Sequence, residues 1–301
     1  MQRSEVFIKC NEVKWTLSTG SSFEFAVARL DEIHPFISGN KYFKLKYNLQ
    51  SAMVKNKHGI ITMGGAFSNH LSATAFACNE AGLQSAGIIR GEIIQPLNST
   101  LSFCEQMQMQ IIPVERKDYN RNSETVEEIR QKHDHLFFIP EGGDNEEGLQ
   151  GCKEILSMIP DADSFTHILC CMGTGTTFKG IAASAKVHQT VIGIPVLKIR
   201  TDERELFIQQ HATIESAAEK QVLFGHAGDG YAKLSEGQIN FMNSFYTKTG
   251  IPTDIVYTGK LMQAVISLAE QYFFESKNKI LVLHTGGLQG NSSLKPGTLL
   301  Y

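Results

Sequence analysis

Short apolar segments alternate with amphipathic segments over most of the chain. An apolar run of about four to eight residues that stops at glycine or a polar residue predicts a strand, and apolar residues spaced by three and four predict a helix. The alternation therefore predicts parallel sheets with helices on both faces. The predicted strands cover residues 60–63, 86–89, 110–114, 136–139, 165–172, 190–196 and 279–284, and the predicted helices cover 68–81, 97–109, 125–132, 147–159 and 175–186.

Two further helices are predicted towards the C-terminus. Ser235 and Gln238 have the spacing of a capping box, which predicts a helix that ends near Gly250 and is followed by Pro252. After it, apolar residues recur at helical spacing and predict the core-facing side of another helix. This stripe consists of Leu261, Ala264, Val265, Leu268, Ala269 and Tyr272.

Composition and charge exclude several classes of protein. The 301 residues are 42% hydrophobic, which is enough for an ordered core and about two domains of roughly 150 residues. The 28 Lys and Arg against 31 Asp and Glu give a net charge of −3, so we expect neither nucleic acid nor an anionic membrane as a partner. No apolar run reaches about 18 residues, so no membrane span is expected. The first ten residues lack the apolar core of a signal peptide, which predicts a cytoplasmic location.

The cysteines and histidines give no metal-site pattern. Six cysteines are spread along the chain without a CxxC motif, and the ten histidines form no HExxH motif. In a chain without an export signal, such cysteines are expected to be reduced thiols. We therefore expect no metal site.

A lysine stands at the predicted start of a helix, where Ser38, Gly39 and Asn40 precede Lys41. The positive end of the helix dipole, together with burial, would lower the pKa of this amine and make it a better nucleophile. The simpler interpretation is a solvated lysine in a basic helix, because Lys44 and Lys46 follow closely. The spacing alone leaves both interpretations open.

A second candidate segment, Gly64-Gly65-Ala66-Phe67-Ser68-Asn69-His70, lies between a predicted strand and a predicted helix. Ligands of open parallel sheets bind at the carboxyl ends of strands, which suits a binding role for this turn. Ser68 or Asn69 could equally be the N-cap of the helix that follows.

The third segment, residues 171–180, is rich in glycine and threonine and joins a strand to a helix. Its backbone N–H groups, hydroxyls and helix dipole suit a phosphate, although a tight strand–helix turn is the alternative. It matches neither the Walker A pattern nor the GxGxxG dinucleotide pattern, because no GK[ST] closes it and Phe178 stands at the third glycine position. A fourth segment, His284-Thr285-Gly286-Gly287, ends the last predicted strand.

If these four segments meet at one edge of the sheets, they combine a phosphate-binding turn with a lysine at a helix start. This pair of features suits a phosphorylated aldehyde cofactor that is bound through the lysine amine.

Seven segments in order along nearly the whole chain resemble one enzyme family. That family is the 1-aminocyclopropane-1-carboxylate deaminase / D-cysteine desulfhydrase family, whose members are pyridoxal-phosphate enzymes of the tryptophan synthase β-like fold. The resemblance implies two three-layer α/β/α domains with open, twisted, mostly parallel sheets. The matching segments are SGNKYFKLKY (38–47), GGAFSNH (64–70), IPEGGDNEEGLQG (139–151), GTGTTFKG (173–180), GYAK (230–233), DIVYTGK (254–260) and LHTGGLQG (283–290).

The resemblance also implies roles for single residues. Lys41 would bind pyridoxal 5'-phosphate covalently and later move the Cα proton of the substrate. Asn69 would contact the 3-hydroxyl side of the cofactor, and Ser68 would contact the substrate carboxylate or assist proton transfer. Tyr231 and Tyr257 match the active-site tyrosines of the family.

The same comparison assigns the rest of the cofactor site. Thr285 would approach the pyridine nitrogen, and no catalytic role is assigned to His70. The phosphate would be held by Gly173, Thr174, Gly175, Thr176 and Thr177.

Three positions depart from the family pattern. Phe67 replaces a frequent glutamine, and Phe43 replaces an arginine. Thr258 follows Tyr257 where the cyclopropane deaminase has glutamate. A carboxylate at that position would keep the pyridine nitrogen protonated and the ring strongly electron-withdrawing, as the opening of a cyclopropane requires. A neutral threonine favours the elimination of a good β-leaving group such as sulfide.

These observations predict a D-cysteine desulfhydrase-like β-elimination that gives pyruvate, ammonia and sulfide. Two alternatives are a 1-aminocyclopropane-1-carboxylate deaminase, which gives 2-oxobutanoate and ammonia, and a protein that binds pyridoxal phosphate or another phosphate ligand without turnover. The expected partner is a small amino-acid substrate, and the resemblance suggests a homodimer.

The order of the motifs changes the expected domain division. Lys41 precedes the first predicted strand, whereas residues 173–177 and Thr285 belong to the second half of the chain. If they share one cofactor, the early segment folds back onto the late one. We therefore expect a large domain of residues 1–43 plus 151–301 and a small inserted domain of residues 44–150.

Overall fold

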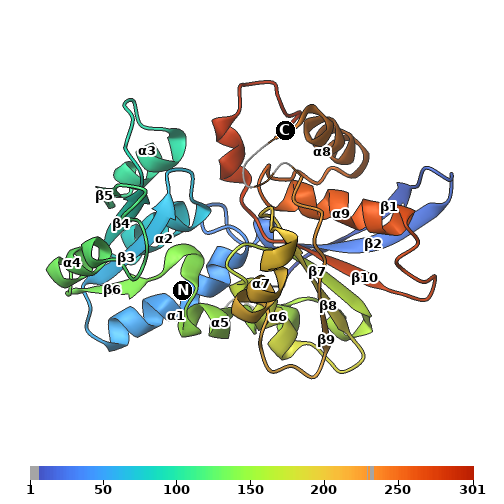
Figure 1. Ribbon diagram of the computed structural model, residues 1–301, viewed down its shortest axis with the longest axis horizontal. Coiled ribbons are helices and arrows are strands. Elements are labelled where there is room, and N and C mark those ends of the chain that lie inside the picture. The colour runs from blue at the N-terminus through green and yellow to red at the C-terminus, as the bar shows by residue number, and fades with distance from the viewer. Residues whose placement is uncertain (1–6, 229, 231–233) are drawn as a thin grey trace.

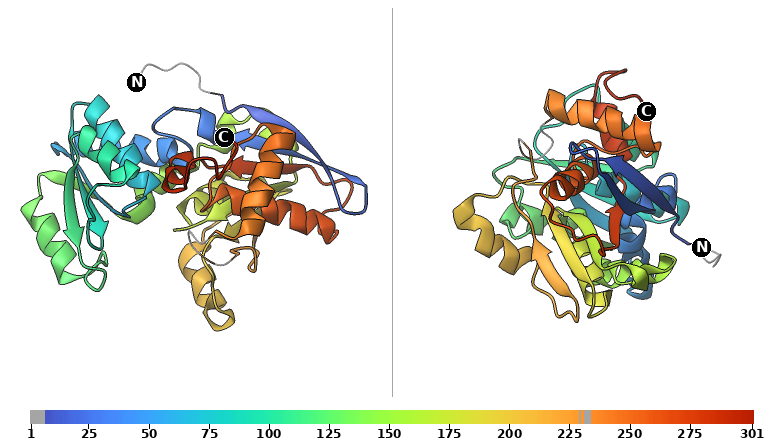
Figure 2. Two further views of the ribbon diagram at one scale, coloured as in Figure 1. Left: turned by 90° about the horizontal axis from the view of Figure 1, so that it is seen from above. Right: turned by 90° about the vertical axis from the view of Figure 1, so that its right-hand side faces the viewer.

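The computed structural model describes residues 7–228, 230 and 234–301. Its strands form a six-stranded sheet in the order β1-β2-β10-β7-β8-β9 and a four-stranded sheet in the order β5-β4-β3-β6. The two sheets lie at opposite ends of the long axis, as Figure 1 and the view from above in Figure 2 show. None of the helices in the described residues is long and apolar enough to cross a membrane.

The six-stranded sheet is parallel except at one edge, where β1 runs antiparallel to β2. β10, the last described strand, lies between β2 and β7. The carboxyl ends of β2, β10, β7, β8 and β9 therefore share one edge of the sheet. The strands are β1 (Cys10–Thr16), β2 (Ser22–Arg29), β7 (His167–Met172), β8 (Thr190–Pro195), β9 (Glu219–Val222) and β10 (Ile280–His284).

Alternate residues of these strands enter two different cores, because successive side chains of a strand point to opposite faces. Ile168 and Cys170 belong to a cluster that contains Phe178 of α6 (Thr176–Ser184). Leu169 and Cys171 belong to a second cluster, to which α8 (Glu236–Thr249) and α9 (Thr258–Glu270) contribute. Both faces of the sheet are therefore buried, as the continuous apolar strands predict.

The four-stranded sheet is parallel throughout and consists of β3 (Gly59–Gly65), β4 (Gln84–Arg90), β5 (Gln110–Val114) and β6 (Leu136–Ile139). Apolar residues of α1, α2 and α3 pack on one face, and α4 packs on the other. The helices are α1 (Asn40–Val54), α2 (Asn69–Glu80), α3 (Ser99–Gln106) and α4 (Glu124–Lys132).

Two helices connect the sheets in space. α1 contacts both α2 and α5 (Glu146–Cys152), and α5 in turn contacts α6 on the six-stranded sheet. The remaining helix, α7 (Arg204–His211), follows β8 in the chain. The strands of the small sheet all fall within residues 44–150 and those of the large sheet outside them, and we retain this division as a proposal for the domains. Its boundary at residues 43 and 44 lies inside α1.

The structure corrects some predicted boundaries. Tyr272 lies beyond the end of α9 with a φ of 56° and 76% of its surface exposed, so it does not continue the apolar stripe. Ser235 does cap α8 by accepting from the Gln238 backbone N–H, but the Gln238 side chain donates to the Ile255 carbonyl instead of completing the capping box. α3 and α5 are shorter than the predicted helices 97–109 and 147–159.

Candidate active site

The start of α1 lies against the turn that follows β10. Gly39 has a φ of 69°, and a Cβ built on it would stand 1.9 Å from the Thr285 carbonyl oxygen, so a side chain has no room here. The Asn40 backbone N–H donates to the same oxygen at 3.2 Å. This contact brings Lys41, the second residue of α1, beside Thr285, although more than 240 residues separate them in the sequence.

These segments enclose one pocket, and it contains most of the predicted site residues. Ser68 and Thr176 are not among the described residues that line it, and Tyr231 lies outside the described residues. The pocket is lined by Asn40, Lys41, Lys44, Asn69, Gly142, Cys171, Gly173, Thr174, Gly175, Thr177, Tyr257, Thr285 and Gly286.

The amine of Lys41 has a lowered pKa. Burial and then the positive charge of Lys44 lower the pKa of Lys41 to about 7. Its Nζ donates to Asn40 Oδ1 at 3.0 Å, while Asn40 Nδ2 donates to Thr177 Oγ1 at 2.8 Å. Lys41 is therefore a partly deprotonated, nucleophilic amine at neutral pH, and Asn40 connects it to the start of α6.

The glycine-rich segment after β7 forms the N-terminus of α6. Gly175 has a φ of 81°, and a Cβ on it would come within 2.3 Å of the His211 carbonyl oxygen. The first amides of a helix have no carbonyl partner within the helix, so those of Thr176 and Thr177 are suited to an anion. The Thr176 hydroxyl, in contrast, donates to Asp144 Oδ1 at 2.6 Å and is directed away from the pocket.

Lys44 is a pocket residue that the sequence interpretation missed. Its side chain is 2% exposed, its Nζ donates to the Gly142 carbonyl oxygen at 2.8 Å, and within the described part of the chain it has no ion pair. Burial lowers the pKa of Lys44. A buried ammonium without a carboxylate is costly unless an anionic ligand offsets it. The sequence did contain a sign of this role: Lys44 follows Lys41 by three residues, and this spacing places both lysines on one side of a helix.

Two buried polar groups beside the lysines have no partner among the described residues. One is Asn69 Oδ1, and the other is the ring of His70, both of whose nitrogens lack a hydrogen bond. Burial, followed by the charges of Lys41 and Lys44, lowers the pKa of His70 well below its ordinary value. Buried polar groups are normally hydrogen-bonded, so these atoms mark a place where a polar ligand fits.

Ser68 takes the simpler of its two predicted roles in this structure. It is the N-cap of α2, and its hydroxyl accepts from the Leu71 backbone N–H at 3.4 Å. The two aromatic departures also lie away from the pocket lining. Phe43 is fully buried in the core that contains Phe178, on one face of the six-stranded sheet, and Phe67 is 51% exposed.

At the carboxyl end of β10, Thr285 contacts a thiol. Its Oγ1 lies 3.1 Å from Sγ of Cys171, near the end of β7 and just before the glycine-rich segment. Burial raises the pKa of Cys171 to about 11, so this sulfur is a neutral thiol. Cys171 was missed as a site residue, since a cysteine in an apolar strand is usually only a small core residue.

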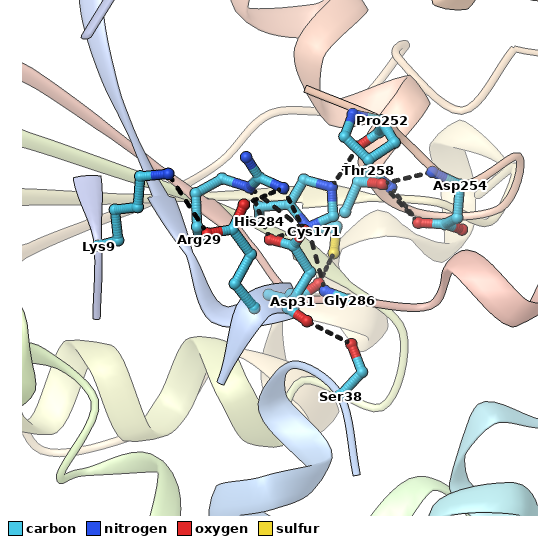
Figure 3. A network of polar contacts seen from close by, with 12 residues as sticks. Lys9, Arg29, Asp31, Ser38, Cys171, Pro252, Asp254, Thr258, His284 and Gly286 are labelled. Atoms are coloured by element: carbon cyan, nitrogen blue, oxygen red, sulfur yellow. Dashed lines mark hydrogen bonds and ion pairs between the residues drawn. The ribbon is translucent and has the colours of Figure 1, made fainter. Parts of the chain in front are cut away.

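Thr258 has a different environment from the one that the sequence suggested. Its hydroxyl donates to Asp254 Oδ2 at 2.6 Å and accepts from the Asp254 backbone N–H at 2.7 Å, as Figure 3 shows. The same carboxylate accepts from the backbone N–H groups of Val256, Tyr257 and Thr258. Asp254 and Thr258 therefore fix the start of α9, and Tyr257 lines the pocket beside them.

Comparisons with known proteins agree with this geometry. The family model described as "Pyridoxal-phosphate dependent enzyme" matches residues 17–286. A relative from Thermotoga maritima named putative 1-aminocyclopropane-1-carboxylate deaminase is 30% identical, with 91% of this chain and 92% of the relative aligned. A D-cysteine desulfhydrase from Klebsiella pneumoniae is 25% identical over 88% of this chain and 87% of the relative.

An Arabidopsis thaliana protein carries both names. It is called bifunctional D-cysteine desulfhydrase/1-aminocyclopropane-1-carboxylate deaminase, mitochondrial, and is 28% identical over 92% of this chain and 76% of its own length. Among solved structures, one titled ACC deaminase homologue aligns with a TM-score of 0.74 at 23% identity, over 95% of this chain and 90% of that chain. This last similarity supports the fold.

Proposed function

Because the chain belongs to the family of pyridoxal-phosphate dependent enzymes, we propose that it catalyses a β-elimination from a small amino acid. We infer D-cysteine as the substrate, with water as the second reactant and pyruvate, ammonia and sulfide as the products. The names of the relatives from Klebsiella and Arabidopsis support this choice, and so does the chemistry of the pocket described below.

The residues of the pocket fit pyridoxal phosphate. Lys41 supplies an amine with a pKa of about 7 for the aldehyde, and the N-terminus of α6 supplies amides for the phosphate. Lys44 supplies a buried positive charge without an ion pair in the described residues, and Asn69 Oδ1 supplies an unsatisfied acceptor. We propose that Lys41, Lys44, Asn69 and Thr285 hold the cofactor together with residues 173–177.

One observation carries the choice of reaction. Among the residues that the structure describes around the pocket, none is aspartate or glutamate. The hydroxyl of Thr258 is bonded to Asp254, and the group beside the pocket at the end of β10 is the neutral Thr285, which contacts a neutral thiol. A neutral partner for the pyridine nitrogen favours the departure of a good leaving group such as sulfide over the opening of a cyclopropane.

When bound, pyridoxal phosphate withdraws electrons from the substrate Cα, which makes its proton removable. We propose that the Lys41 amine takes up this proton, because its lowered pKa matches neutral pH. Tyr257 and Tyr231 are proposed to hold or move protons on the substrate side, and Ser68 to contact the substrate carboxylate. Tyr257 lines the pocket, whereas Ser68 would first have to exchange its capping bond to Leu71.

A substrate panel tests the proposal. The purified protein, loaded with pyridoxal phosphate, is assayed for keto acid with D-cysteine, L-cysteine, β-chloro-D-alanine and 1-aminocyclopropane-1-carboxylate. We expect turnover of D-cysteine and β-chloro-D-alanine, both of which carry good leaving groups. Turnover of the cyclopropane acid alone would overturn the argument from the neutral pocket. A yellow protein that is inert to every substrate would indicate binding without catalysis.

Thr258→Glu sharpens this test. A carboxylate at position 258 should raise the ratio of cyclopropane-acid turnover to D-cysteine turnover if it reaches the pocket. Thr258→Val serves as the matched control, because it removes the hydroxyl without adding charge. Equal ratios in the two variants would show that the charge at this position does not decide the reaction.

We propose two further features: a homodimer, which the family resemblance suggests, and a cytoplasmic location. Size-exclusion chromatography with light scattering measures the first, and fractionation of cells that express the full chain measures the second. The name of the Arabidopsis relative includes the word mitochondrial, so the fractionation should include a mitochondrial fraction.

A further inference from the structure

His284 ends β10 and is fully buried. Its Nδ1 lies 3.0 Å from Asp31 Oδ1, and its Nε2 lies 2.7 Å from the Pro252 carbonyl oxygen. Figure 3 shows the ring between these two oxygens. The Gly286 backbone N–H also donates to Nδ1, but at 3.4 Å this bond is longer than the 3.0 Å contact with Asp31.

A count of protons fixes the charge of this ring. A carbonyl oxygen is only an acceptor, so Nε2 must carry a proton to bond Pro252. Asp31 accepts from Nε and Nη2 of Arg29 through its two oxygens, so it is a carboxylate and an acceptor as well. Because the shorter contact of Nδ1 is the one to this carboxylate, we assign a proton to Nδ1 as well. A histidine that donates from both nitrogens is an imidazolium.

The charge of the imidazolium is balanced locally. Arg29 donates to both oxygens of Asp31, at 2.9 and 2.7 Å, and its guanidinium also pairs with Glu32 at 2.8 Å. Lys9 pairs with Glu32 at 3.6 Å on the exposed side. Two buried cations, Arg29 and His284, therefore share the buried Asp31 carboxylate, and the more exposed Glu32 pairs with Arg29.

The same ring joins three segments that carry pocket residues. Thr285 follows His284 directly in the chain. Asp31 belongs to the segment that leads to Lys41, and Ser38 Oγ donates back to the Asp31 carbonyl oxygen at 3.2 Å. Pro252 begins the loop that leads to Asp254 and Tyr257. One side chain thus fixes the chain on three sides of the pocket.

We propose that His284, held doubly protonated between the Asp31 carboxylate and the Pro252 carbonyl, is a positioning residue for the reaction. It holds the Thr285 turn in register with the start of α1 and with the loop before α9. The consequence for catalysis rests on the function proposed above, whereas the protonation state does not.

The protonation state is tested directly. The cofactor-free protein is labelled with ¹⁵N-histidine, and one-bond N–H couplings are recorded at pH 7, with the His284 signals assigned by their loss in His284→Gln. We expect a bonded proton on both ring nitrogens. A single protonated nitrogen would overturn the proposal, whatever the enzyme does.

The positioning role is tested with a pair of variants. His284→Leu should lower kcat for D-cysteine about 100-fold with a smaller change in KM, since a displacement of about 1 Å of the reacting groups has an effect of that size. His284→Gln retains a donor for one of the two oxygens and should recover at least tenfold of the loss. His167→Asn is the control and should retain wild-type kcat, because His167 begins β7 and the pocket lies at the carboxyl end of that strand.

A second readout separates positioning from stability. Each folded variant is mixed with saturating pyridoxal phosphate, reduced with borohydride, and the fraction of Lys41 modified is measured by peptide mass spectrometry. His284→Leu should lower this fraction, and His284→Gln should partly restore it. A lower melting temperature with unchanged kcat and unchanged modification would reduce His284 to a stabilising residue and overturn the proposal. If wild-type Lys41 is not modified, the proposed function fails while the ¹⁵N result still stands.

Discussion

Two buried groups of basic side chains flank the pocket, and they differ in what balances their charge. Arg29 and His284 are paired with Asp31 and Glu32. Lys41, Lys44 and His70 face one another, and no carboxylate pairs with them in the described residues. Burial alone disfavours the charged form of the basic side chains in both groups.

The pKa values of the two groups shift in ways that reflect this difference. In the paired group the charges of Asp31 and Glu32 outweigh burial and raise the pKa of Arg29, while that of Asp31 falls to about 2. In the second group burial is the largest cause and lowers the pKa values of all three residues, and positive neighbours add to it for Lys41 and His70. The paired group is complete without a ligand, whereas the unpaired group requires an anion. In the function proposed above, the phosphate of the cofactor is that anion.

The largest effect is expected at the centre of the unpaired group. Lys41→Ala should abolish the visible absorbance of the bound cofactor and the turnover of D-cysteine, because it removes the amine that we propose binds the aldehyde, and the Lys44 amine is held by the Gly142 carbonyl. Absorbance spectra and keto-acid assays measure both. A variant that retains the absorbance band and full turnover would show that Lys41 does not bind the cofactor.

Lys44→Met should weaken pyridoxal phosphate binding about 100-fold, because it removes the buried ammonium that we propose pairs with the anionic cofactor. The cofactor-free variant should melt at a higher temperature than the wild type, because a buried ammonium without a carboxylate is removed. Lys46→Met is the control, since Lys46 pairs with Glu154 near the surface. Titration of cofactor and thermal melts give the two quantities, and a variant that binds as tightly as the wild type would contradict the role assigned to Lys44.

Asp31→Asn should destabilise the protein by about 2 kcal/mol at pH 7, because the pKa of Asp31 falls from 3.8 to about 2 on folding. A lowered carboxyl pKa stabilises the fold above about pH 4, and this contribution is lost as the pH falls through about 2. The difference between wild type and variant should therefore shrink by about half at pH 3. Urea unfolding at both pH values measures it, with the exposed Asp202→Asn as control. An equal difference at both pH values would contradict the charge pairing.

The smallest effect concerns pH and Lys41. Below pH 7 its amine is protonated and unreactive, so its reductive methylation by formaldehyde and cyanoborohydride should be about tenfold slower at pH 6 than at pH 8. Peptide mass spectrometry follows the reaction in the cofactor-free protein. In urea-unfolded protein the rate should keep rising above pH 8, because an ordinary lysine has a pKa of about 10.4. Identical profiles in the two states would show that folding does not lower this pKa.

The sequence predicted well the features that depend on neighbours in the chain. The apolar runs located β3 to β8 and β10, and the glycine-rich segment after β7 did form a helix N-terminus beside the pocket. The hairpin of β1 and β2, together with α7 and β9, was not predicted. β1 has only two buried residues, Val13 and Trp15, so its apolar signal is weak.

The parts of the site that were missed depend on contacts between distant segments. Lys44 follows Lys41 by three residues and was interpreted as solvated, because only the approach of Gly142 and Gly143 buries it. The hydroxyl of Thr258 is bonded to Asp254, a partner that the resemblance did not identify. Spacing in the sequence shows which residues share a side of a helix, but it does not show what covers that side.

The position of β10 has a consequence for biosynthesis. This strand enters the middle of the large sheet, between β2 and β7, and the turn after it forms the wall beside Lys41. During translation the reactive amine leaves the ribosome early, but its pocket cannot close until residue 287 has followed. Until then, the edge of β2 that pairs with β10 has no partner strand. Loading of the cofactor is therefore a late event, and a chain truncated before β10 should be unable to acquire it.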